Sequence, residues 1–210
     1  MAVWKNLVIG AACFSVISGA VLAASPAGAP ANLRFDSLPA GDYVVEPSHT
    51  RILFSVSHLG FTTWYGDFSH ASGAAKIDPH HPAASNLQVS VPADSISTTN
   101  QVLDGELKGA DWFDAARFPA ITFTARKLTL TSPNRGEIVG DLTLHGVTRP
   151  LTLQVRFNGS GANPLDKVYT AGFEAVGQIK RSDFGVAKYV PMVGDNVMVI
   201  ISAAFVRKPS

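Results

Sequence analysis

From Gly41 to Arg207, apolar side chains recur at every second position in a series of short segments. This is the period of a β-strand, because successive side chains of a strand point to opposite faces of the sheet. One such segment runs through Ile52, Phe54, Val56 and His58. Equivalent patterns begin near residues 87, 121, 138, 151, 169 and 197, with turn-forming stretches between several of them. The sequence therefore predicts an all-β domain of about eight antiparallel strands, enough for a closed barrel that encloses one small ligand.

One segment, residues 98–118, interrupts the alternation. Thr98 and Gln101 have the spacing of a capping box, which predicts a short helix that ends in a turn at Gly109. An aromatic stretch, Asp111-Trp112-Phe113-Asp114, follows before the next strand. This insert could be a lid over the mouth of the barrel or a plug packed outside the sheet, and core packing is the more frequent fate of such aromatic residues.

The N-terminal residues have the pattern of an export signal. Lys5 is the only charged residue before Arg34, and the run that follows Lys5 is mainly apolar and ends in small residues. We therefore expect a signal peptide over residues 1–23 and export to the periplasm, rather than a permanent membrane anchor. The proline-containing stretch over residues 24–40 predicts a linker, which leaves residues 41–208 for the barrel.

Composition excludes several classes of protein and site. The formal net charge is +1, so the chain offers no basic field for nucleic acid. The single cysteine, Cys13, lies in the predicted signal peptide, which excludes a disulfide framework and a thiolate zinc cluster. The sequence has no His-Glu-x-x-His motif, no Gly-x-Ser-x-Gly elbow and no phosphate-binding loop. We expect no metal, no cofactor and no catalytic residues, although an acid–base pair inside the barrel stays open as an alternative.

The last predicted strand is apolar on both faces. Val197, Val199 and Ile201 lie on one face, and Met198 and Ile200 lie on the other. A strand with one face in water alternates apolar and polar residues, so another element or a second subunit is expected to cover this region. A homodimer is therefore left open. Most other predicted strands have polar outer faces, which favours a soluble protein over an outer-membrane barrel.

Several sequence blocks, in their order along the chain, resemble the YceI-like family of secreted, lipocalin-like isoprenoid-binding proteins. They are the opening strand at 49–58, the stretch at 94–98, the aromatic block at 111–114, the hairpin at 140–150 and the turn at 181–185. The resemblance covers about residues 41–207. Two positions depart from the family pattern, since Glu46 stands where Asp is usual and Thr50 where Ser is frequent.

This resemblance implies an extended eight-stranded antiparallel lipocalin-like barrel with a short helical insert. It also implies a soluble periplasmic protein that binds an isoprenoid-type lipid, a polyprenyl phosphate or a quinone, in an apolar tunnel for transport, storage or sequestration. The expected partner is this lipid and not nucleic acid, while transient membrane contact and a homodimer stay open. The alternatives are an enzyme that acts on a lipid or quinone inside the barrel, and a stress-related envelope interaction protein without a ligand.

On this interpretation, inward apolar side chains form the wall of the tunnel and a few polar groups at its mouth contact the ligand's head group. Without the resemblance, the pattern favours His58 as a hydrogen-bonded core histidine and Arg181 as a partner of Asp183 in a turn, and the apolar set could equally be a filled core. The candidate ligand-binding residues are Phe54, Val56, His58, Phe61, Trp64, Tyr65, Trp112, Phe113, Phe123, Leu142, Phe173, Arg181 and Phe184.

Overall fold

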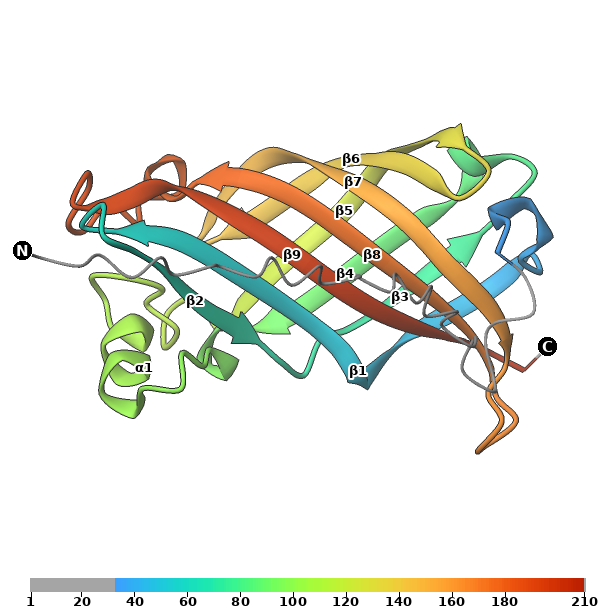
Figure 1. Cartoon of the computed structure of the whole chain (residues 1–210), viewed down its shortest axis with the longest axis horizontal. Coiled ribbons are helices and arrows are strands. Elements are labelled where there is room, and N and C mark those ends of the chain that lie inside the picture. The colour runs from blue at the N-terminus through green and yellow to red at the C-terminus, as the bar shows by residue number, and fades with distance from the viewer. Residues whose placement is uncertain (1–32, 210) are drawn as a thin grey trace, which may run out of the picture.

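The computed structural model describes residues 33–209, which form one closed antiparallel barrel with a helical insert (Figure 1). The predicted signal peptide and most of the predicted linker lie outside the described residues. The strands are β1 (Gly41–His58), β2 (Thr62–Phe68), β3 (Ser72–Ile77), β4 (Asn86–Pro92), β5 (Ala120–Ser132), β6 (Arg135–Leu144), β7 (Val147–Ala162), β8 (Tyr169–Lys180) and β9 (Val193–Arg207). The helix is α1 (Gln101–Lys108), and the short 3-10 helices are η1 (Phe35–Ser37), η2 (Pro82–Ala84), η3 (Ala93–Ser95) and η4 (Arg181–Phe184).

Two consecutive short strands share one position around the barrel. The first residues of β1 pair with β3, from Gly41 opposite Ile77, and its last residues pair with β2, as far as His58 opposite Thr62. The other edge of β1 pairs with β9, and this pairing closes the sheet. The nine strands therefore build the eight-stranded antiparallel barrel that the sequence predicts.

An irregularity in β1 divides the strand into these two halves. The register with β9 shifts between Glu46 and Arg51, a stretch that contains Pro47. Proline has no N–H to donate to the ladder, so it is found at edges and bulges. Thr50 restores a contact there, because its Oγ1 accepts a hydrogen bond from the backbone N of Ala204 at 3.1 Å. The bend of β1 at this point is visible in Figure 1.

The structure differs from the linker prediction at its C-terminal part. The Phe35 and Leu38 side chains are buried in the barrel core. The ring of Phe35 packs edge-on against that of Phe157, with centroids 6.0 Å apart, and its backbone N donates to the oxygen of Pro133. Burial of two large apolar side chains fixes this segment, so it forms one end of the barrel instead of a free connection.

The predicted helix is present, but its N-cap is Asn100 and not Thr98. The Asn100 Oδ1 accepts from the backbone N of Val102 and of Leu103, which satisfies two otherwise free helix donors. The helix ends at Gly109, as predicted. Within residues 33–209, no helix is long and apolar enough to cross a membrane.

Candidate ligand-binding cavity

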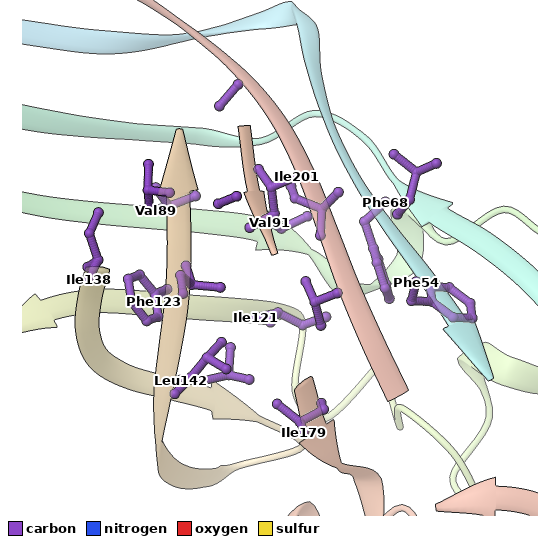
Figure 2. A pocket seen from close by; sticks show the side chains of 18 of the residues that line it. Phe54, Phe68, Val89, Val91, Ile121, Phe123, Ile138, Leu142, Ile179 and Ile201 are labelled. Carbon is purple, nitrogen blue, oxygen red and sulfur yellow. The ribbon is translucent and has the colours of Figure 1, made fainter. Parts of the chain in front are cut away.

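A cavity of about 470 Å³ occupies the interior of the barrel. Figure 2 shows side chains from different strands converging on this space, and the labelled ones are all hydrocarbon. The volume falls in the range of pockets that hold one small ligand. The labelled wall residues are Phe54, Phe68, Val89, Val91, Ile121, Phe123, Ile138, Leu142, Ile179 and Ile201.

Partial exposure of inward-facing residues shows that the barrel is hollow. Val197, Val199 and Ile201 line the cavity from β9, yet all three keep intermediate exposure. Inward residues of a filled core are close-packed and buried. Such packing occurs on the opposite wall, where Ile138 and Leu142 of β6 are buried. Inward residues of other strands, such as Val89, Ile121 and Val155, are likewise only partly buried, so the free space is not confined to one wall and the interior is not a filled core.

Two glycines let large rings lie against the wall. A Cβ on Gly66 would come within 2.4 Å of the Phe54 ring, and a Cβ on Gly140 would come equally close to the Phe123 ring. Gly66 is the direct cross-strand partner of Phe54. Because the glycines have no side chain, each ring covers neighbouring backbone instead of projecting farther into the lumen.

Aromatic and charged side chains surround one end of the cavity, which we call the mouth. It is lined by Leu103, Glu106, Trp112, Tyr189 and His58. Glu106 and Tyr189 both line the cavity and face solvent. Trp112 donates from Nε1 to Oε1 of Glu106 at 3.1 Å, and its ring lies edge-on to that of Tyr189, with centroids 6.2 Å apart.

The helical insert both packs in the core and covers the mouth. Leu107 and Trp112 are buried, and the ring of Phe113 packs edge-on against Phe68 with centroids 5.4 Å apart. The same three insert residues also line the cavity. The two alternatives for this segment, a lid and a packed element, are therefore combined in one structure.

Arg181 is a buried cation held by backbone carbonyls. Its Nε donates to the oxygen of Gly194, Nη1 to that of Val186 and Nη2 to that of Val193, at 2.8–2.9 Å. Burial lowers its pKa from the usual value, against a smaller opposing effect of Asp195. An arginine keeps its charge at neutral pH even so. Arg181 therefore fixes the connection between β8 and β9 instead of pairing with Asp183, and its guanidinium lies over the Trp112 ring at 5.4 Å.

Trp64 brings an unsatisfied donor to the cavity wall. Its Nε1 is buried and has no hydrogen-bond partner among the described residues. Its ring lies 5.8 Å from that of His58, centroid to centroid, and both side chains line the cavity. A buried donor without an acceptor costs about 1–3 kcal/mol.

Most of the predicted ligand-binding residues line this cavity. Three do not: Tyr65 is 61% exposed, Phe61 is 87% exposed and Phe184 is buried elsewhere. Tyr65 faces outward because it alternates with Trp64 along β2, and Phe61 lies in the turn after β1. Phe184 packs in the core beside η4, where its backbone oxygen lies 3.1 Å from Nδ1 of His145. The predicted residues in the wall are Phe54, Val56, His58, Trp64, Trp112, Phe113, Phe123, Leu142, Phe173 and Arg181.

The sequence interpretation missed several wall residues. Val89, Ile121 and Ile201 follow the same alternation and could have been included on that signal. Glu106 and Tyr189 carry no such signal, because connections that are distant in sequence bring them to the mouth. Among residues 33–209, no three His, Cys, Asp or Glu side chains gather as a candidate metal site.

Comparison with known proteins agrees with this architecture. The sequence model described as the YceI-like domain matches residues 43–205. Protein YceI of Escherichia coli O157:H7 is 35% identical over 182 residues, which cover 85% of this chain and 94% of that protein. A UPF0312 protein of Azotobacter vinelandii is 34% identical over 171 residues, covering 80% and 88%.

Solved structures give the same result for the fold. The crystal structure of Burkholderia cenocepacia BcnA superposes with a TM-score of 0.69 at 25% identity, covering 76% of this chain and 98% of that one. A polyisoprenoid-binding domain from Saccharophagus degradans superposes with a TM-score of 0.58 at 15% identity, covering 79% and 98%. The second likeness concerns the fold alone.

Proposed function

This chain belongs to the YceI-like family, and on that premise we propose that its barrel binds one long-chain isoprenoid lipid, a polyprenyl phosphate or a quinone, in the central cavity. The observation that carries the proposal is a hollow barrel whose middle is lined by hydrocarbon and whose mouth carries polar groups. The polyisoprenoid binding of the structural neighbour from Saccharophagus degradans supports the same ligand class.

The hydrophobic effect accounts for the affinity. A long isoprenoid chain is insoluble, and each buried CH₂ contributes about 0.8 kcal/mol to binding. The side chains of Phe54, Val56 and Phe173 would enclose such a chain. After a shift of the Trp64 ring that exposes its buried Nε1 to the cavity, this donor would bind an oxygen of the head group, which both a phosphate and a quinone provide.

The arrangement favours binding over catalysis. Two charged side chains near the mouth, Glu106 and Arg181, are engaged by the protein itself. Glu106 accepts from Trp112 and lies 3.6 Å from Nζ of Lys188, and Arg181 is bonded to three carbonyls. General acid–base chemistry needs a group free to exchange a proton with the substrate, and among the described imidazole and carboxyl groups at the mouth only that of His58 is without a hydrogen-bond partner in the protein. We therefore propose a carrier or sequestering protein, exported to the periplasm by the signal over residues 1–23.

A titration tests this proposal. Delipidated protein would be titrated with undecaprenyl phosphate and with a long-chain ubiquinone, and tryptophan fluorescence would report binding. We expect saturable quenching by at least one lipid, which Phe173→Asp abolishes because the carboxylate would face the cavity. Val176→Asp is the matched control, since Val176 lies on the same strand and is 44% exposed on the outer face. Equal binding by both variants, or no binding by the unmodified protein, would contradict the proposal.

A further inference from the structure

Exposed apolar side chains gather on two neighbouring connections at one end of the barrel. Leu59 and Phe61 lie in the turn between β1 and β2 and are 48% and 87% exposed, and Tyr189 and Met192 lie between β8 and β9 at 50% and 57%. The backbone N of Leu59 donates to the oxygen of Met192 at 2.8 Å, so the connections are adjacent. Figure 1 shows both at the same end of the barrel. We call these four residues the apolar rim.

The apolar rim borders the mouth of the cavity. Tyr189 belongs to both, since half of its surface is exposed and it also lines the cavity. His58 and Val193 are paired across β1 and β9, and both line the cavity. The rim residues Leu59 and Met192 are their direct neighbours in the chain. The rim is anchored through Lys188, which is bonded to Asp111 of the insert at 3.0 Å.

The rim itself lies in segments without charged side chains, whereas Arg181, Asp183 and Lys188 precede it in the connection between β8 and β9. No Asp, Glu, Lys or Arg occurs between Arg51 and Asp67, or between Lys188 and Asp195. The opposite end of the barrel carries the exposed Arg34–Asp36 ion pair and the exposed Arg135 together with the exposed Leu33 and Leu165. The rim therefore offers an uncharged apolar surface beside the mouth, which favours contact with an apolar phase.

The size of the rim decides between candidate partners. Its four side chains expose on the order of 500 Å², if a large side chain offers about 150–250 Å². A stable interface with a second copy needs about 800 Å² on each partner. A bilayer interface has no such requirement, because a few aromatic and aliphatic side chains inserted among the head groups are sufficient for reversible binding.

We propose that the apolar rim docks onto the surface of a lipid bilayer, so that the ligand passes between membrane and cavity without crossing water. This inference rests on the proposed function, since only a water-insoluble ligand needs such a path. The docking itself depends on the rim and not on the ligand. Docking and lipid binding can therefore be measured separately.

The test is flotation of ligand-free protein with vesicles of phosphatidylcholine alone and of phosphatidylcholine with phosphatidylglycerol. We expect binding to both, lowered about tenfold or more by Phe61→Asp, because burial of a phenyl ring in the interface is replaced by burial of a charge. Leu165→Asp is the matched control. Leu165 is 92% exposed in the connection between β7 and β8, at the far end, and this variant should bind like the unmodified protein.

Four outcomes would overturn the docking proposal. The first three are no flotation of the unmodified protein, flotation of Phe61→Asp equal to that of the unmodified protein, and binding to anionic vesicles alone that added salt abolishes. A fourth is a dimer in solution that Phe61→Asp dissociates, which would make the rim a self-association surface. The lipid titration is run on the same variants. Since Phe61 does not line the cavity, retained lipid affinity with lost flotation separates a failure of docking from a failure of the proposed function.

Discussion

Phe54 of β1 and Gly66 of β2 are direct cross-strand partners, and the ring of Phe54 occupies the space that a side chain on Gly66 would need. Any Cβ at residue 66 would lie 2.4 Å from this ring, which is closer than van der Waals contact permits. The pair keeps a large aromatic side chain against the wall of the barrel. It is one reason why a strand with bulky inward residues still leaves a hollow interior.

This relationship predicts the effect of Gly66→Ala. The added methyl group would displace the Phe54 ring toward the lumen, so we expect lipid affinity to fall about tenfold, with a stability loss of about 1–3 kcal/mol from overpacking. Lipid titration and urea unfolding check both values. Gly105→Ala is the control, since nothing lies within 4 Å of its added Cβ and alanine favours the helix. Unchanged affinity in a folded Gly66→Ala variant would refute this role of the pair.

Because Arg181 is buried and bonded to three carbonyls, we expect even its conservative replacement by lysine to lower the stability of the fold strongly. Arg181→Lys cannot reproduce the three hydrogen bonds to carbonyls, because an ammonium lacks the planar fork of a guanidinium. We expect the free energy of unfolding to fall by about 3 kcal/mol, measured by urea denaturation. The comparison variant is Arg126→Lys, which alters an exposed ion pair with Asp141 and should cost less than about 1 kcal/mol. Equal costs for the two variants would contradict the structural role of Arg181.

The buried hydroxyl of Tyr43 should make the free energy of unfolding depend on pH in the alkaline range. Burial raises the pKa of its hydroxyl from 10.0 to about 12, and the hydroxyl donates to the oxygen of Pro39 at 2.7 Å. The folded state therefore keeps this proton where the unfolded state loses it. Its contribution to stability is complete below pH 10 and is lost as the pH rises toward 12. Tyr43→Phe should unfold with a smaller pH slope between these values, measured by denaturant titration, and an equal slope would exclude Tyr43 as the origin.

We expect the N-cap of α1 to affect both the stability of the helix and the rate at which the ligand leaves the cavity. Asn100→Ala removes the acceptor for two helix N–H groups, which should cost about 1 kcal/mol in thermal or urea unfolding. Because Leu103, Glu106 and Leu107 line the cavity from this helix, we also expect faster release of lipid. Stopped-flow transfer of a fluorescent isoprenoid to vesicles measures the rate. Gln101→Ala, at an exposed neighbouring position, should change neither quantity.

The alternating pattern predicted the barrel and much of its wall because strand periodicity is a local property of the sequence. It assigned Phe54, Val56, Phe123 and Phe173 to the interior, where the structure has them. It could not predict the shared position of β2 and β3. That arrangement depends on the shift in β1 around Pro47, which becomes a bulge only against β9.

Other features required distances that periodicity does not contain. Trp64 and Tyr65 are neighbours on one strand, so only one of them can face the lumen, and the sequence alone did not decide which. Phe35 was assigned to a linker because the stretch over residues 24–40 contains several prolines among small residues and has no periodicity, while the burial of Phe35 depends on Phe157 far along the chain. The hollow interior likewise depends on where large rings rest, as the Phe54–Gly66 pair shows.

Native mass spectrometry of the protein, expressed with its predicted signal peptide, is the direct measurement of lipid binding in the cavity. We expect a chain that carries one isoprenoid, which organic extraction removes and which added undecaprenyl phosphate or long-chain ubiquinone restores. A ligand-free mass that neither lipid shifts, from a protein with intact β structure by circular dichroism, would contradict lipid binding in the cavity.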